Sequence, residues 1–229
     1  NSDLTLGGPS SIFLADGKTL TYGGAALSLG ANILNITGSG TLSNMNSLVL
    51  GDSAGVLRLS GTNTISGPVT LNAGTIDVNE SSSLSSNLNL GGSATIDVAQ
   101  DKTLTYEGAP LSLGANKLTI SGNGSFSATN ALLLDDSDSQ LTITGSSVLS
   151  GAEVSTALTT GIKISESSTI NSLTIGDLTP VAIAVEKSLA GNIVVNNEGI
   201  LRLTNKGALA SAVVLNGGTI DIYETLALS

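Results

Sequence analysis

The sequence predicts an all-β protein that folds as a parallel β-helix (β-solenoid), right-handed and triangular in section, with about eleven coils of about twenty residues each. Three observations predict this fold: a long internal repeat, a shorter period of apolar pairs, and a composition dominated by small side chains. Because the same pattern runs through nearly the whole chain, residues 1–229 are expected to form a single solenoid domain.

The long repeat relates segments 84 residues apart, since Leu4-Thr-Leu-Gly-Gly8 recurs as Leu88-Asn-Leu-Gly-Gly92. In the same register, Lys18-Thr-Leu-Thr-Tyr22 recurs as Lys102-Thr-Leu-Thr-Tyr106. A second register relates residues 55–78 to residues 199–222, at an offset of 144. Both offsets are multiples of about twenty residues, so they predict whole numbers of stacked units.

The short period is set by pairs of apolar residues that flank one other residue. Successive pairs begin near Leu4, Leu27, Leu48, Val69, Leu88, Leu111, Leu132, Leu173, Ile193 and Val213, with a degenerate unit near Val154 to Leu158. A regular spacing of about twenty residues is typical of solenoids, in which each unit is one coil.

A single unit shows the expected order of strands and corners. Val69 and Leu71 form the first pair, a corner rich in Asn and Gly follows, and Ile76 and Val78 form the second pair. The unit ends with Leu84 between two serines. Alternation with period two indicates strands with one buried face, and strands this short bury that face only by stacking on the next coil. In the first coil the expected inward residues are Leu4, Leu6, Ile12, Leu14 and Leu20.

The composition excludes several classes of function. The chain has no His, Cys or Trp, which excludes Ser-His-Asp and Cys-His catalysis, His-metal sites and disulfides. Its net charge is −10 with only 8 Lys and Arg residues, so nucleic acid is not an expected partner. No apolar run approaches the roughly 18 residues that span a bilayer, so this segment is not expected to insert into a membrane.

One segment resembles a known family of repeats. Residues 55–78, which begin Gly-Val-Leu-Arg-Leu-Ser-Gly-Thr-Asn-Thr, resemble the passenger-associated β-strand repeat of bacterial autotransporters. Residues 199–222 are similar to a second, more divergent copy. The resemblance implies a secreted or surface-exposed bacterial passenger domain, often adhesive, located outside the cell on an outer-membrane-anchored parent. We therefore expect the chain to be a fragment of a longer surface protein.

The third strand of each coil carries hydroxyl residues on both sides of its inward residue. The expected column before the inward residue includes Thr19, Thr41, Thr64 and Thr103, and the column after it includes Thr21, Ser43, Ser66 and Thr105. Such a stripe is the candidate ligand-binding surface, with a glycan as its expected ligand. An ice-binding face is a weaker alternative, because Ser and Ala interrupt the threonines.

Acidic residues form two further candidate sites. Asp135, Asp136 and Asp138 are the densest acidic cluster and a candidate Ca²⁺ site, although they lack the Gly and distal Glu of an EF-hand. Asp77 and Asp97 are expected as neighbouring outward carboxylates, as in a polysaccharide-degrading β-helix enzyme, but Arg58 beside Asp77 favours a surface charge ladder.

One segment matches a catalytic signature. Gly51-Asp-Ser-Ala-Gly55 fits the Gly-x-Ser-x-Gly pattern of serine hydrolases. The chain has no His to act as the base, so a coil corner is the better interpretation.

These observations favour a non-enzymatic adhesin segment without a required cofactor. Its expected partners are glycans or proteins of host-cell or bacterial surfaces, and its open ends make self-association possible. The alternative function is a passive stalk or export scaffold whose binding tip lies elsewhere in the parent protein.

Overall fold

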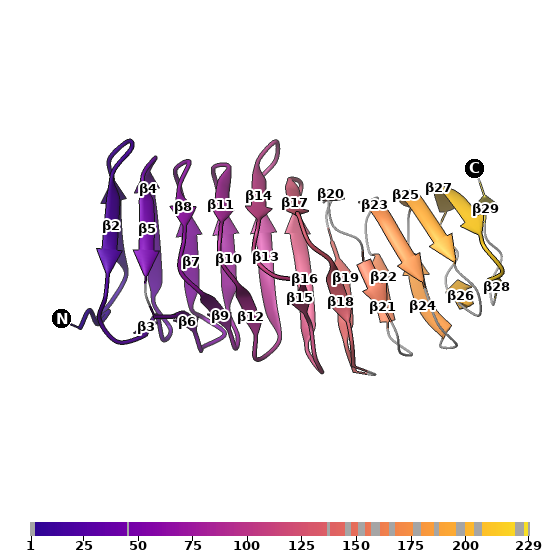
Figure 1. Cartoon of the computed structure of the whole chain (residues 1–229), viewed down its shortest axis with the longest axis horizontal. Coiled ribbons are helices and arrows are strands. Elements are labelled where there is room, and N and C mark those ends of the chain that lie inside the picture. The colour runs from indigo at the N-terminus through magenta and orange to yellow at the C-terminus, as the bar shows by residue number, and fades with distance from the viewer. Residues whose placement is uncertain are drawn as a thin grey trace.

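The computed structural model is a rod of stacked strands with the two termini at opposite ends (Figure 1). Strands are the only regular elements among the residues that it describes. The described residues are 3–44, 46–136, 138–144, 148–150, 154–156, 161–164, 168–175, 180–185, 188–195, 200–203, 208–222 and 227–228. The predicted fold class, an all-β parallel solenoid, is confirmed.

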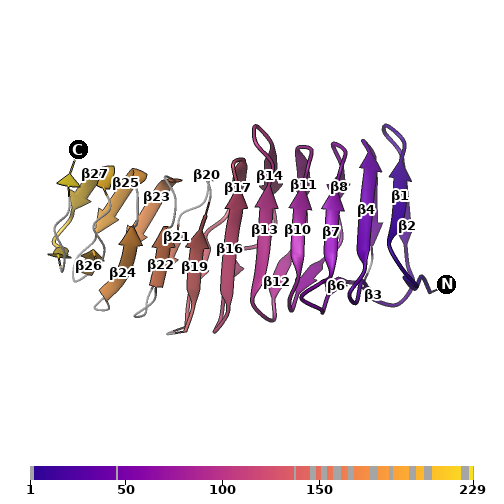
Figure 2. The same cartoon turned by 180° about the vertical axis from the view of Figure 1, so that it is seen from behind.

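Face A of the rod is an eleven-stranded parallel sheet that takes one strand from each successive turn (Figure 2). Its strands in order are β1 (Ser10–Leu14), β4 (Ile33–Gly38), β7 (Val56–Leu59), β10 (Thr75–Val78), β13 (Ala94–Val98), β16 (Lys117–Gly122), β19 (Gln140–Ile143), β22 (Gly161–Ile164), β24 (Pro180–Val185), β26 (Ile200–Leu203) and β28 (Thr219–Ile222).

Face B is formed by the strands that follow face A in each turn. They are β2 (Thr19–Tyr22), β5 (Thr41–Asn44), β8 (Thr64–Ile65), β11 (Ser82–Leu84), β14 (Thr103–Tyr106), β17 (Ser125–Ala128), β20 (Val148–Ser150), β23 (Ser168–Ile175), β25 (Ser188–Val195), β27 (Ala208–Leu215) and β29 (Ala227–Leu228). Three of these strands, β23, β25 and β27, are eight residues long and continue from face B onto the third face of the rod, face C. The register shifts between Ile170 and Leu173 where β23 does so.

Face C carries the first strand of each turn. A four-stranded sheet contains β3 (Leu27–Ser28), β6 (Leu48–Leu50), β9 (Val69–Leu71) and β12 (Leu88–Leu90). The face continues with β15 (Leu111–Ser112), β18 (Leu132–Leu134) and β21 (Val154–Thr156), which join the face B sheet through β23. Leu158, at the end of the predicted degenerate unit, lies outside the described residues.

The strands follow the internal repeat of the sequence. Residues 10–14 of β1 correspond to 94–98 of β13, at the offset of 84, and residues 75–78 of β10 correspond to 219–222 of β28, at the offset of 144. About seven turns, up to Ser150, are described with only short gaps in the chain. This is fewer than the predicted eleven coils, because the corners of the later turns fall largely outside the described residues.

The core consists of columns of aliphatic side chains, each residue stacked on its partner in the next turn. On face A, Leu57 pairs with Ile76 and Ile76 with Ile96, and all three are fully buried. On face C, Val69 pairs with Leu88. Burying one such side chain stabilises the fold by roughly 1.5–3 kcal/mol before conformational entropy is subtracted. This stacking explains how a chain with 2% aromatic residues holds a continuous core.

The corner between faces A and B varies in length, and this changes the register of face B. In the fifth turn, residues 99–102 separate β13 from β14, and Asp101 adopts a positive φ of 60° within a turn closed by Lys102 N–H donating to Ala99 O. The fourth turn has a shorter corner, residues 79–81. Leu104 therefore pairs with Ser82, and Tyr106 with Leu84.

Candidate functional site

Outward hydroxyl residues form an unbroken line across six consecutive turns of face B. Each pairs with the next through the parallel strand register, and neighbouring strands lie about 4.8 Å apart. This hydroxyl column consists of Thr19, Thr41, Thr64, Ser83, Thr105 and Ser127. Because hydroxyl groups both donate and accept hydrogen bonds, the column presents a repeating polar surface.

The column differs from the sequence prediction in one place. Thr105, expected in the column after the inward residue, continues the column of Thr64 through Ser83. Thr103, expected to extend that column beyond Ser83, does not pair with Ser83. It pairs with Ser125, and its N–H donates to Ser81 Oγ at 3.1 Å. The physical reason is the longer corner at residues 99–102, which moves every following residue of β14 along the strand.

The other predicted hydroxyl residues lie at one end of the same face. Thr21 pairs with Ser43 in the first two turns. Ser66 follows β8, and its N–H donates to Leu42 O at 2.9 Å. The structure therefore brings all eight predicted residues to face B. Thr105 joins Thr19, Thr41 and Thr64 in the hydroxyl column, Thr21, Ser43 and Ser66 lie outside it, and Thr103 belongs to neither group.

A shallow groove of about 240 Å³ crosses the hydroxyl column at the third to fifth turns. Every residue that lines it carries a hydroxyl or amide group: Thr62, Asn63, Thr64, Ser81, Ser82, Ser83, Thr103 and Thr105. Three of them, Thr64, Thr103 and Thr105, are among the predicted site residues. Ser83 also belongs to the expected column, although it was not named as a candidate site residue. The sequence prediction missed Thr62, Asn63, Ser81 and Ser82, since the groove depends on how adjacent corners align.

Hydrogen bonds hold the side chains of this hydroxyl groove in place. Ser83 Oγ donates to Thr64 Oγ1 at 3.1 Å, which links two members of the column. Ser82 Oγ lies 2.8 Å from Gly61 O and points inward. Asn63 is 1% exposed, and its amide nitrogen donates to Gly38 O at 2.8 Å. The floor of the groove is therefore built from fixed polar groups.

The carboxylates of face A are neighbours but each has its own partner. Asp77 pairs with Asp97 in the register of β10 and β13. Arg58 Nε donates to Asp77 Oδ2 at 2.7 Å, and Ser121 Oγ donates to Asp97 Oδ1 at 2.5 Å. The partly exposed ion pair contributes about 0–1 kcal/mol. Arg58, Asp77 and Asp97 therefore follow one another on successive strands, as expected from the sequence for a ladder of surface charges.

The candidate Ca²⁺ residues lie in the loop after β18. Asp135 accepts hydrogen bonds from Ser112 Oγ at 2.5 Å and from Gly114 N–H at 2.9 Å. Asp136 Oδ1 accepts from Asp138 N–H at 2.9 Å. In the described part of the chain, these carboxylates do not form a group of three or more that could hold a metal ion. Ca²⁺ binding by them stays a prediction.

Gly51–Gly55 forms a turn between faces C and A. Gly55 N–H donates to Asp52 O at 2.9 Å, and Asp52 Oδ1 accepts from Ala54 N–H at 2.8 Å. Ser53 is exposed on this turn. The segment therefore has the geometry of a coil corner.

Comparison with known proteins gives no assignment: no protein-family model, curated protein or solved structure matches the chain. Within the described residues, no helix is long and apolar enough to cross a membrane.

Proposed function

We propose that this chain is a non-enzymatic β-solenoid segment of an extracellular bacterial adhesin, and that it attaches to glycans on host-cell or bacterial surfaces. The observation that carries the proposal is the hydroxyl column with its groove on face B. The hydroxyl groups of a sugar are hydrogen-bonded to water in solution. When the sugar binds, the protein must replace those hydrogen bonds. A row of fixed hydroxyls can supply both donors and acceptors to the sugar.

The shallow shape of the surface favours an extended ligand over a small one. A pocket for a small molecule encloses most of its ligand, whereas the hydroxyl groove is an open depression. Each turn adds another hydroxyl, so a chain of sugars could contact several turns at once. Several weak contacts made at once along a rigid rod give a higher overall affinity than any one of them alone.

The location outside the cell is supported by the resemblance of residues 55–78 to autotransporter passenger repeats. Within this segment, β7, β8, β9 and β10 form one continuous path around the solenoid. In the proposed role, the parent protein holds this rod away from the bacterial surface, and the rod needs no cofactor. The proposed role does not require Ca²⁺ at Asp135, Asp136 and Asp138.

A passive stalk is the alternative function, and the continuous pairing of face A over eleven strands supports a rigid spacer. The two functions differ in whether the surface of this chain binds anything. An adhesive segment requires the hydroxyl column, whereas a stalk requires only the core.

The test is binding of the labelled chain to a glycan array, in Ca²⁺ and in chelator. We expect saturable binding to a subset of glycans, lost in the triple variant Thr64→Val, Ser83→Ala, Thr105→Val. The matched control is Thr75→Val, Thr95→Val, Thr119→Val, which removes three aligned hydroxyls from face A. A folded chain that binds no glycan would favour the stalk. Equal binding by the two variants would exclude the hydroxyl groove as the glycan-binding site.

A further inference from the structure

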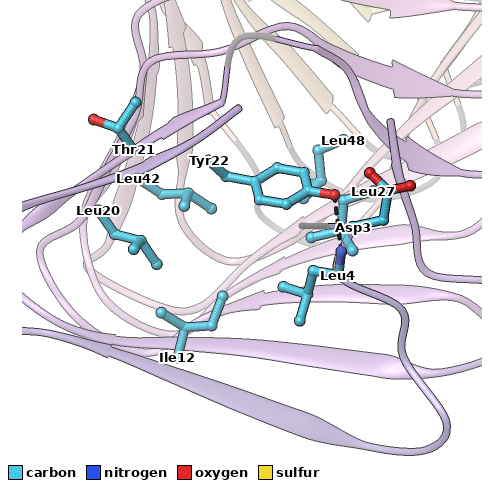
Figure 3. A pocket seen from close by; sticks show the side chains of 9 residues that line it. All are labelled: Asp3, Leu4, Ile12, Leu20, Thr21, Tyr22, Leu27, Leu42 and Leu48. Carbon is cyan, nitrogen blue, oxygen red and sulfur yellow. Dashed lines mark hydrogen bonds between the residues drawn. The ribbon is translucent and has the colours of Figure 1, made fainter. Parts of the chain in front are cut away.

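Among the described residues that line the hydroxyl groove, none is charged. They are threonines, serines and one asparagine, so the polar groups that meet a ligand there are hydroxyls and an amide. The end cavity at the first turn, of about 220 Å³, has a different lining, which is mostly apolar and includes Leu4 and Leu20 (Figure 3). An apolar lining offers sugar hydroxyls no hydrogen bonds. The hydroxyl groove offers donors and acceptors, but no full charge to balance that of an ion.

One ion pair borders the hydroxyl groove. Glu80 directly precedes the lining residue Ser81, and Lys102 directly precedes the lining residue Thr103. Lys102 Nζ donates to Glu80 Oε2 at 2.7 Å, and the pair links the corners of the fourth and fifth turns. The two corners also meet where Thr103 N–H donates to Ser81 Oγ at 3.1 Å. The ammonium group at this edge of the groove is therefore already engaged by a carboxylate.

The charges at this edge are negative on balance. Asp101 is exposed in the same corner as Lys102. Two carboxylates, those of Glu80 and Asp101, therefore accompany one ammonium group, in a chain whose net charge is −10. A field of this sign repels a negatively charged ligand and slows its approach to the surface.

Three other cations lie away from the groove. Arg58 donates to Asp77 on face A, and Lys117 begins β16 of face A. Lys18 lies in the first turn, two strands before Thr64, which is about 10 Å along the rod. At about 0.15 M salt an exposed charge at that distance is largely screened. An acidic ligand in the groove would therefore meet the ammonium group of Lys102 only in competition with Glu80.

We propose that the hydroxyl groove is specific for neutral glycans, and that Glu80 determines this specificity by keeping the Lys102 ammonium group occupied. This specificity rests on the proposed glycan-binding function and adds the chemical class of the glycan. A neutral sugar needs only the hydroxyl and amide partners that the groove supplies. A carboxylate or sulfate group on the glycan would lose part of its hydration, would be repelled by the negative surface, and would gain no charge-assisted hydrogen bond from Lys102.

The test is a binding titration of the whole chain on matched pairs of glycans, each pair being a neutral oligosaccharide and its sialylated or sulfated form. We expect the parent chain to bind the neutral member more tightly. Glu80→Gln releases the Lys102 ammonium group, so affinity for the acidic member should rise about two- to fivefold, the range for a charge pair exposed to solvent. This gain should shrink as salt is added.

The matched control is Asp77→Asn. It also opens a partly exposed ion pair and changes the net charge by the same amount, but it does so on face A. It should therefore keep the parent's preference for the neutral member. In the double variant Glu80→Gln, Lys102→Gln the gain for acidic glycans should disappear, because the ammonium group is gone. Circular dichroism establishes that each variant is folded before its binding is compared.

The results separate this specificity from glycan attachment itself. The specificity is overturned if the parent chain binds acidic members as tightly as neutral ones, or if Glu80→Gln keeps the parent's preference. An equal gain in Asp77→Asn would show that net charge sets the preference, which would overturn the role of Glu80. Glycan attachment would stand in all three cases. A parent chain that binds no member of any pair would overturn the proposed function and the specificity together.

Discussion

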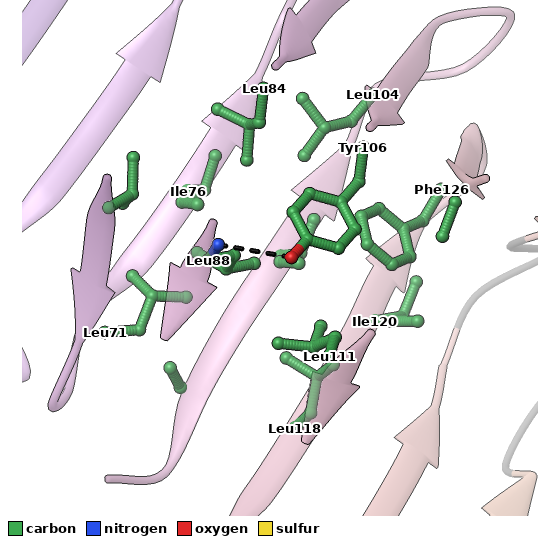
Figure 4. Packing of buried hydrophobic residues seen from close by; sticks show 14 of the residues in the cluster. Leu71, Ile76, Leu84, Leu88, Leu104, Tyr106, Leu111, Leu118, Ile120 and Phe126 are labelled. Carbon is green, nitrogen blue, oxygen red and sulfur yellow. Dashed lines mark hydrogen bonds between the residues drawn. The ribbon is translucent and has the colours of Figure 1, made fainter. Parts of the chain in front are cut away.

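The ring of Tyr106 stacks on the ring of Phe126 in the next turn, with centroids 6.4 Å apart and planes inclined by 19° (Figure 4). The strand register explains the contact, because Tyr106 pairs with Ala128 and Phe126 with Leu104. The small side chain of Ala128 leaves room beneath the tyrosine, and the phenylalanine fills it. The pair thus joins the fifth and sixth turns through the two largest fully buried side chains of the described core.

Replacing Phe126 should weaken this junction strongly. Phe126→Ala leaves a cavity beneath Tyr106, and we expect a loss of about 3–5 kcal/mol in the free energy of unfolding. Urea unfolding followed by circular dichroism measures it. The chain offers a matched control in its other phenylalanine, since Phe13 is 74% exposed and Phe13→Ala should change stability by less than about 0.5 kcal/mol. Similar losses in the two variants would contradict the packing described here.

The Tyr106 hydroxyl should make stability depend on alkaline pH. Burial raises the pKa of Tyr106 above its ordinary value of 10.0, and the hydrogen bond from Leu88 N–H partly opposes the shift. The unfolded chain then loses this proton first, so its contribution to stability is full below about pH 10 and is lost at higher pH. Tyr106→Phe also removes the 2.6 Å bond to Ala109 O, at a cost of about 1–2 kcal/mol.

The measurement is urea unfolding of the parent chain and of Tyr106→Phe between neutral pH and about pH 11. The difference in unfolding free energy between the two proteins should shrink as the pH rises above 10. A difference that stays constant over this range would mean that Tyr106 ionises equally readily in the folded and unfolded chains.

The inward column of face B should tolerate no charge. Leu84 and Leu104 are 1% and 0% exposed, so Leu84→Asp or Leu104→Asp places an unpaired carboxylate in the core. Because each turn is stabilised by its neighbours, adjacent turns should unfold with the substituted one. Thermal melting by circular dichroism tests this, with the exposed Ser85→Asp as control. Parent-like melting of either core variant would refute the inward assignment.

The effect of substituting Asp101 on stability should depend on the new side chain, because the backbone of Asp101 is left-handed. Asp101 has a φ of 60°, and its repeat counterpart, Gly17, has a φ of 62°. A β-branched residue fits this conformation poorly. Asp101→Val should cost about 1–2 kcal/mol, whereas Asp101→Gly should change stability by less than about 0.5 kcal/mol. Denaturant unfolding compares them, and equal stability of the two variants would show that the corner relaxes.

The sequence pattern predicted the order of strands and the inward residues well, because burial follows a strict alternation. Leu84 and Leu104 are buried as expected, and Leu14 is 3% exposed. Leu4 and Leu20 were also expected to face inward. They do line the end cavity, but they remain exposed because the described residues provide no turn to cover them.

The alignment between turns was harder to predict than the strands. The repeat aligned Thr103 with Ser83, but Ser83 pairs with Thr105. Corner length sets this register, and adding residues in a corner leaves the apolar alternation unchanged. The same limit applies to the hydroxyl groove, whose lining includes Thr64, Ser83 and Thr105 from three aligned turns.

The most direct test of the proposed function is a binding titration of the fluorescent chain on cultured host cells and on bacterial cells. The parent chain and the variant Thr64→Val, Ser83→Ala, Thr105→Val would be compared after both are shown to be folded. We predict saturable binding by the parent chain, competed by soluble glycan and weakened at least about tenfold in the variant, which corresponds to about 1.4 kcal/mol. No saturable binding, or equal binding by the two proteins, would contradict the account of face B as an adhesive surface.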